Sequence, residues 1–218
     1  MKKTTRTSKV TTVVNFILDE SGSMEPIKEA TIAGFNKYLK GLKQQKEKFL
    51  FTLTKFDSTG LRTPYLMTDV KKVEPLDNVT YTPGANTPLY DAVVETVEKV
   101  AAEITGDQAV LVAIMSDGEE NSSVKHDEKC LQELIQKLEK RGNWTFVFMG
   151  ANQDSWATAS NWGIAKGNIA NWQATRQGTG EVFGIMAMST SNFSQTMQDN
   201  AAKGVALNAS NFFDNTKK

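Results

Sequence analysis

Oxygen-bearing side chains follow an apolar run near the start of the chain. Residues 13–18 are mostly β-branched, aliphatic or aromatic, and Asp19, Ser21 and Ser23 come next at alternate positions. Such a run predicts a buried strand, and the end of a strand in an open α/β sheet lies where these folds bind ligands. Three oxygen donors on one short loop, with no His or Cys among them, suit a hard cation such as Mg²⁺.

Two later segments offer matching oxygens. The apolar run 109–115 is followed by Asp117, and a loop rich in turn-forming residues at 83–88 presents Thr87. If the two apolar runs form neighbouring strands, both open on one edge of the sheet, at the crevice created where the winding direction changes. Mg²⁺ binds six oxygens and keeps some as water, so an open position would attract a carboxylate from another molecule. The predicted ligands are Asp19, Ser21, Ser23, Thr87 and Asp117.

A helix N-cap is the plainer interpretation of an aspartate followed by serines, and we expect Ser23 to be a cap in any case. Thr87 and Asp117 make a metal site the better interpretation of the whole set.

Four polar neighbours of these residues are given no ligand role. We expect Glu119 and Glu120 in a solvated turn, and Asn121 to brace its loop. Asp91 follows Thr87 by four residues on a predicted helix and should face the loop or the solvent.

The only histidine and the only cysteine indicate no other chemistry. His126 has no Cys or His partner for zinc and no Ser and acid placed for nucleophilic catalysis. We expect it on the surface at a helix start, and Cys130 as a small core residue.

The four tryptophans are concentrated in one third of the chain. We expect Trp144 and Trp162 in the core, whereas Trp156 and Trp172 are candidates for a partner surface, where Trp is favoured. Three methionines should pack along the last helix: Met186, Met188 and Met197.

Periodicity predicts strands that alternate with helices. The expected strands are 10–18, 49–56, 61–67, 109–115, 144–149 and 168–172, and the expected helices are 26–45, 89–104, 127–141, 156–162 and 181–197. This order predicts an α/β fold: a doubly wound, mostly parallel six-stranded sheet with helices on both faces. The strands 49–56 and 61–67 lie so close in sequence that they should form a hairpin, with the second as an antiparallel edge strand. Pro64 fits an edge position.

Length and composition limit the class of protein. The 218 residues suit one domain over residues 10–200, with a polar extension at 1–9 and a partly disordered tail at 201–218 that frays from about Asn208. The 25 basic and 25 acidic residues cancel, which argues against a nucleic-acid partner. One cysteine fits a reducing compartment, and no run reaches the roughly 20 apolar residues of a membrane span. We therefore expect a cytoplasmic protein.

Three motifs together resemble the metal-ion-dependent adhesion site of von Willebrand factor type A (VWA) domains. They are the segment from Asp19 to Ser23, the segment Gly84–Ala92 around Thr87, and the segment Ser116–Asn121. In order and at this spacing they resemble most the stand-alone bacterial and phage members, including those encoded near tellurium-resistance genes. The resemblance implies that the serines and threonine bind Mg²⁺ or Mn²⁺ (Ca²⁺ is a further option), that the aspartates bind directly or through water, and that a partner protein's Asp or Glu completes the shell. Ala85 and Asn86 stand where glycines are common in the family.

Three functions follow, and we favour the first. The chain is a non-enzymatic module that binds an acidic residue of a partner protein through the metal. Alternatively, it is a Mg²⁺-dependent phosphoryl-transfer enzyme with an Asp nucleophile. Such enzymes need a second acid two residues on, where this chain has Ser21, and no Walker loop is present. The third possibility is a scaffold protein in which the metal is purely structural.

Overall fold

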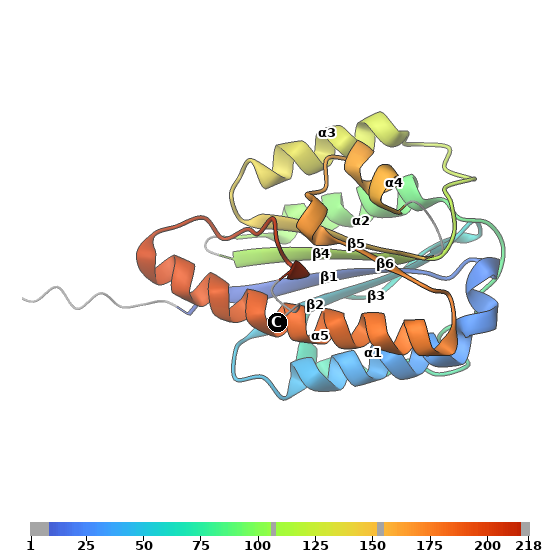
Figure 1. Cartoon of the computed structure of the whole chain (residues 1–218), viewed down its shortest axis with the longest axis horizontal. Coiled ribbons are helices and arrows are strands. Elements are labelled where there is room, and N and C mark those ends of the chain that lie inside the picture. The colour runs from blue at the N-terminus through green and yellow to red at the C-terminus, as the bar shows by residue number, and fades with distance from the viewer. Residues whose placement is uncertain (1–8, 106–107, 152–154, 215–218) are drawn as a thin grey trace, which may run out of the picture.

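Six strands form one sheet in the order β3-β2-β1-β4-β5-β6 in this computed structural model, which describes residues 9–105, 108–151 and 155–214 (Figure 1). The strands are β1 (Thr11–Asp19), β2 (Phe49–Asp57), β3 (Gly60–Asp69), β4 (Gln108–Ser116), β5 (Trp144–Ala151) and β6 (Ile169–Trp172). Only the β2–β3 pair is antiparallel. The predicted fold class, including the antiparallel edge strand, is confirmed.

The centre of the sheet is the pair β1 and β4. Their residues are fully buried hydrophobics over most of their length, because helices cover both faces of parallel strands. The chain leaves β1 toward β2 and β3, then returns and adds β4, β5 and β6 on the other side. The winding direction therefore changes between β1 and β4, and their carboxyl ends open a crevice there.

Helices cover the two faces of the sheet unequally. The helices α1 (Lys28–Lys43) and α5 (Arg176–Lys203) pack side by side on one face, and α2 (Leu89–Glu103), α3 (Glu128–Glu139) and the short α4 (Ser155–Asn161) lie on the other (Figure 1). Short 3-10 turns stand at Gly22–Ile27 (η1), Val70–Lys72 (η2) and Lys166–Asn168 (η3).

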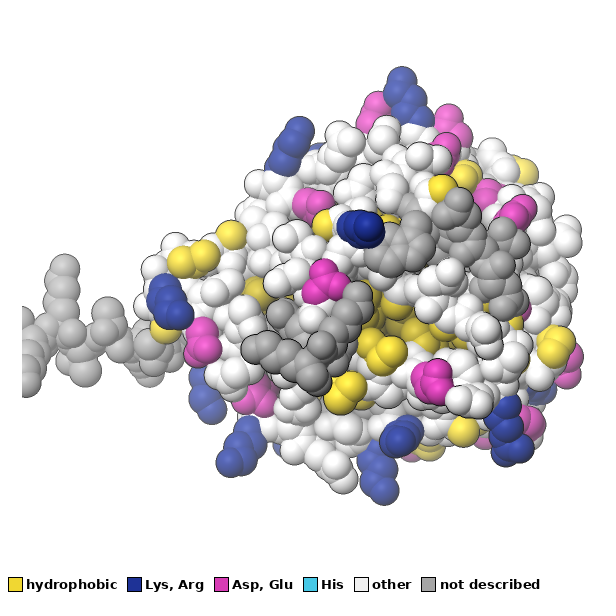
Figure 2. All heavy atoms as spheres, viewed as in Figure 1, with side chains coloured by type: hydrophobic (Ala, Val, Ile, Leu, Met, Phe, Trp, Pro, Cys, Tyr) yellow, Lys and Arg dark blue, Asp and Glu magenta, His cyan; other side chains and the backbone are white. Residues whose placement is uncertain are grey.

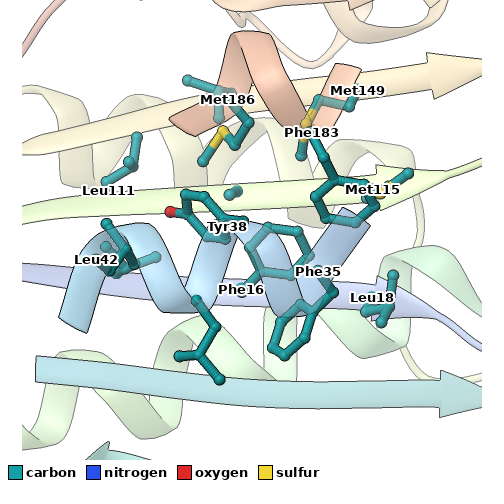
Figure 3. Packing of buried hydrophobic residues seen from close by; sticks show 14 of the residues in the cluster. Phe16, Leu18, Phe35, Tyr38, Leu42, Leu111, Met115, Met149, Phe183 and Met186 are labelled. Carbon is teal, nitrogen blue, oxygen red and sulfur yellow. The ribbon is translucent and has the colours of Figure 1, made fainter. Parts of the chain in front are cut away.

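Aromatic rings join the sheet to α1 and α5 (Figure 3). The ring centroid of Phe16 lies 5.6 Å from that of Phe35 and 6.1 Å from that of Phe183. Gly34 makes this approach possible, since a methyl group at its position would lie 2.3 Å from the Phe183 ring. This packed face fixes the helix that follows Ser21 and Ser23, and so the course of their loop.

Charged side chains of both signs stand on the face of the molecule that Figure 2 shows. Figure 2 shows lysines and arginines standing singly on the face toward the viewer, interspersed with acidic side chains and without a basic patch. Within the described residues, no helix is both long enough and apolar enough to cross a bilayer.

Two residues predicted to be buried are exposed. Cys130 is exposed because α3 turns Leu131 and Ile135 toward the sheet and Cys130 away from it. Met188 is 54% exposed, since the buried stripe of α5 runs through Met186 instead. Trp144 and Trp162, in contrast, are fully buried as predicted, and so is Met197.

The proposed surface role of Trp172 is wrong. This residue ends β6 and is 6% exposed, because it packs into the core on the α5 side of the sheet. The side chain of Trp156 lies outside the described residues.

The segment after α5 also differs from the prediction. The last helix is longer than expected and ends at Lys203, and the chain up to residue 214 packs on the domain instead of fraying from Asn208. Phe212 and Phe213 are buried, and the Phe212 amide donates to Asn168 Oδ1. The predictions of a polar N-terminal extension and a disordered C-terminus also cover residues 1–8 and 215–218, which lie outside the described part of the chain.

Candidate metal centre

The five predicted ligands come together at the carboxyl edge of the sheet. Asp19 ends β1 beside Ser116, the last residue of β4, because Leu18 pairs with Met115. The Ser23 hydroxyl donates to Asp117 Oδ1 at 2.6 Å and lies 3.1 Å from the Ser21 hydroxyl.

Thr87 reaches the same place from the loop before α2. A methyl group built at Gly118 would lie 3.0 Å from Thr87 Oγ1 and 3.2 Å from Ser23 Oγ. Thr87 and Ser23 therefore flank the same glycine, next to Asp117. The geometry joins all the residues that the sequence singled out.

Ser23 does not cap a helix. Its hydroxyl is directed to Asp117, and Ser23 itself lies within the 3-10 turn η1, which stands where the first turn of an α-helix was expected. The α-helix starts only at Lys28, two residues past Pro26, and the position before η1 is held by Ser21, whose side chain makes no capping hydrogen bond.

Asp19 is the buried acid of the site. It is fully buried, Oδ1 accepts the Ser21 amide at 2.7 Å, and Oδ2 accepts the Ser116 hydroxyl at 2.5 Å. Burial raises the pKa of Asp19 to about 6, against the lowering effect of hydrogen bonds from Ser116 and Ser21, and the charge of Asp117 raises it further. A carboxylate in this position is poorly solvated unless a cation joins it.

Asp117 is the more accessible acid. Burial raises its pKa too, while the hydrogen bond from Ser23 lowers it. Within the described residues neither Asp19 nor Asp117 forms an ion pair with Lys or Arg. Two uncompensated carboxylates beside three hydroxyls are the donor set that suits Mg²⁺, Mn²⁺ or Ca²⁺. In the described ranges, no three His, Cys, Asp or Glu side chains are placed so that they could hold a metal ion together, so a zinc-type site has no support there.

Glu20 anchors the loop after β1, a role that our sequence analysis missed. Its buried carboxylate accepts the Thr82 amide at 2.6 Å, Lys55 Nζ at 3.3 Å and Arg62 Nη2 at 2.9 Å. Lys55 and Arg62 are paired across β2 and β3. The sequence does carry a signal for this role. Lys55 lies within the apolar strand β2, and a buried cation needs an acidic partner.

Backbone hydrogen bonds fasten the Thr87 loop to the β1 loop. The Gly22 amide donates to the Ala85 carbonyl at 3.0 Å, and the Gly84 amide donates to the Glu20 carbonyl at 2.9 Å. Ala85 has φ of 59°, the left-handed conformation that glycine adopts more easily. Asn86 bonds to Ser58 through both its backbone amide and its backbone carbonyl.

Two residues that were given no ligand role, Glu120 and Asn121, hold the loop after β4. Asn121 braces it as predicted, since its Oδ1 accepts the Thr87 amide at 2.9 Å. Glu120 is not in a solvated turn: its carboxylate accepts the amides of Tyr90, Ser122 and Ser123. These donors come from both α2 and the loop itself, which explains why an acid is required there.

Asp91 also has a structural role instead of facing solvent. It is 5% exposed, and its carboxylate accepts the amides of Val124, Lys125 and His126 at 2.7–3.3 Å. It contacts the loop, as one of the two predicted options, and is not part of the candidate ligand set.

Comparison with known proteins identifies the architecture. No family model and no curated protein sequence matches this chain. Among solved structures, proximal thread matrix protein 1 from the mussel byssus superposes with a TM-score of 0.60 at 15% identity, over 82% of this chain and 47% of that chain. This chain thus spans about half the length of the mussel protein.

A second solved structure has a similar extent to this chain. The VWA domain of SpRpn10 superposes with a TM-score of 0.55 at 12% identity, over 82% of this chain and 95% of that domain. At such identities the likeness concerns the fold alone. With its strand order and its central crevice, the chain has a VWA-like fold.

Proposed function

We propose that this chain is a divalent-metal-dependent protein-interaction module. Asp19, Ser21, Ser23, Thr87 and Asp117 would hold Mg²⁺ or Mn²⁺, and an Asp or Glu of a partner protein would complete the shell. The observation that carries the proposal is the convergence of these side chains from three loops, through the Ser23–Asp117 hydrogen bond and the contact at Gly118.

The chemistry of the donors supports a partner carboxylate. Three of the five donors are neutral hydroxyls, so much of the charge of a divalent ion would be available to an acid from outside. The balance of 25 basic and 25 acidic residues supports a protein partner over a nucleic acid. A cytoplasmic setting and a stand-alone bacterial or phage origin remain predictions from the sequence.

An enzyme with Asp19 as nucleophile has weaker support. The carboxylate is fully buried and each of its oxygens already accepts a hydrogen bond from Ser21 or Ser116. A nucleophile needs an oxygen that can reach its substrate. We therefore propose binding without turnover.

Metal binding is tested directly with Mn²⁺ as a paramagnetic probe. Titration followed by electron paramagnetic resonance should show one site in the wild type and none in Asp19→Ala or Asp117→Asn. Asp127→Asn is the matched control: Asp127 caps α3, its oxygen accepts the Cys130 amide, and asparagine keeps that oxygen. Equal Mn²⁺ binding by wild type and Asp117→Asn would contradict the proposed site.

Partner binding needs a separate measurement. Tagged protein is incubated with host lysate in Mg²⁺, in EDTA, and as Asp19→Ala in Mg²⁺. A partner retained only by the wild type in Mg²⁺ supports the module. A partner retained in all three lanes, together with a lower melting temperature in EDTA, indicates the scaffold with a structural metal instead.

A further inference from the structure

A hollow opens beside the candidate metal centre, between the start of α2 and the carboxyl ends of β4 and β5. Its volume is about 260 Å³, and Leu89, Tyr90 and Phe148 form its apolar wall. Pockets that enclose cofactors or drug-sized ligands measure roughly 300–1,000 Å³. The hollow therefore suits one long side chain of a larger partner better than a free cofactor.

The hollow and the metal centre share two residues. Ser116 and Gly118 line the hollow. The Ser116 hydroxyl also donates to Asp19, and a methyl group built on Gly118 would lie 3.0 Å from Thr87 Oγ1 and 3.2 Å from Ser23 Oγ. A partner chain whose carboxylate sits at the metal could thus place a side chain a few residues away into the hollow.

The charge around the hollow is negative. Three of the side chains that line it are glutamates, Glu119, Glu120 and Glu128, and its described lining contains no lysine or arginine. Glu120 is turned inward to accept backbone amides. Glu119 and Glu128 are exposed, and neither forms an ion pair with a described basic residue.

Two of the lining residues, Tyr90 and Phe148, are aromatic, and both pack against the buried ring of Trp162. The Trp162 ring packs edge-on against Phe148, with centroids 5.0 Å apart, and against Tyr90, with centroids 6.1 Å apart. Burial raises the pKa of Tyr90, and the charges of Glu128 and Glu120 raise it further, which places both carboxylates close enough to act on the ring. Aromatic faces attract cations, and arginine most often.

We infer that this hollow is a specificity pocket for a basic side chain, with arginine preferred, that lies close in sequence to the metal-binding acid of the partner. Carboxylates on the rim would pair with the cation while its aliphatic stem packs on Leu89 and Phe148. The inference rests on the proposed function, because the metal-bound acid sets the distance at which the basic residue must stand.

Random 12-residue peptides displayed on phage test the inference. They are selected on immobilised protein in Mg²⁺ and eluted with EDTA, on wild type and on Glu119→Gln/Glu128→Gln. The matched control is Glu25→Gln/Glu133→Gln, which removes two exposed charges outside the hollow. We expect wild type and control to enrich peptides with an acid and an Arg or Lys at one fixed spacing, and the pocket variant to lose the basic residue but keep the acid.

A double-mutant cycle on one selected peptide gives the size of the effect. Replacing its basic residue by Ala, or using the pocket variant, should each weaken binding about tenfold, and the two changes together should cost no more than either alone. Enriched peptides without a basic residue at fixed spacing, or a pocket variant with wild-type affinity, would overturn the pocket and leave the module intact. If EDTA releases no peptide from wild type, the module and the pocket both fail.

Discussion

Two loops meet at the candidate metal centre, and each is held by a buried acid that is not itself a predicted ligand. Glu20 holds the loop after β1, and Asp91 holds the loop after β4. Glu20 is paired with side-chain cations from β2 and β3, whereas Asp91 accepts only backbone amides of the loop that it anchors.

The difference lies in what each anchor requires of the rest of the sequence. The Glu20 anchor depends on Lys55, whose side chain is only 9% exposed and would be left unpaired without the acid. The Asp91 anchor needs no particular residues in its loop, because every residue type except proline supplies an amide N–H. The first loop is thus tied to the hairpin at the sheet edge, whereas the Asp91 anchor leaves the side chains of residues 124–126 in the second loop free to vary.

Breaking the first anchor should have the largest effect. Glu20→Gln leaves the buried Lys55 ammonium without a counter-charge, and we expect a loss of about 3–5 kcal/mol in the free energy of unfolding, measured by urea denaturation. The partly exposed Arg62 contributes little to this loss. Glu95→Gln breaks the exposed Lys125–Glu95 pair and is the control, with little change expected. Similar losses of stability in the two variants would show that the buried Glu20–Lys55 pair contributes no more than an exposed ion pair.

The second anchor should give a smaller and more local effect. Asp91→Asn places an amide donor against backbone N–H groups that need an acceptor, at a cost of about 1.5–3 kcal/mol. Hydrogen exchange should quicken at Val124, Lys125 and His126 while the β1 loop stays protected. Faster exchange in both loops would show that they are not held independently.

The comparison also explains what the sequence predicts well. The strand order, the antiparallel edge and the convergence of the five candidate residues depend on patterns along the chain: apolar runs, turn residues, and oxygens at strand ends. Glu20 and Asp91 follow no such pattern. Their partners lie 33 to 62 residues away in sequence, so their roles become visible only when the loops are placed in space.

The errors in predicted burial have a related cause. Met188 and Trp172 belong to residue types that occur in cores and at interfaces alike, and only the rotation of α5 or the path of β6 decides between them. The tail was misjudged because its composition is polar, while two residues, Phe212 and Phe213, hold it in place.

Gly118, in the loop after β4, allows a test of the centre itself. Gly118→Ala would place a methyl group 3.0 Å from Thr87 Oγ1 and 3.2 Å from Ser23 Oγ and push both hydroxyls aside. We expect Mn²⁺ affinity to fall about 10–100-fold, as for changes that misplace ligands at metal sites. Gly84→Ala, where a methyl group meets nothing within 4 Å, is the control and should bind as wild type does. Unchanged affinity in Gly118→Ala would separate these hydroxyls from the metal.

The smallest effect is expected at the contact that joins the Thr87 loop to the β1 loop. Ala85 is held at φ of 59° so that its carbonyl can accept the Gly22 amide, and a left-handed residue other than glycine is strained by about 1–2 kcal/mol. Ala85→Gly removes this strain but makes the unfolded chain more flexible, so unfolding by urea should show a net gain of about 0.5–1 kcal/mol. Ala165→Gly, at an ordinary φ of −61°, should instead lose stability. Equal losses of stability in the two variants would show that the backbone conformation of Ala85 costs no measurable stability.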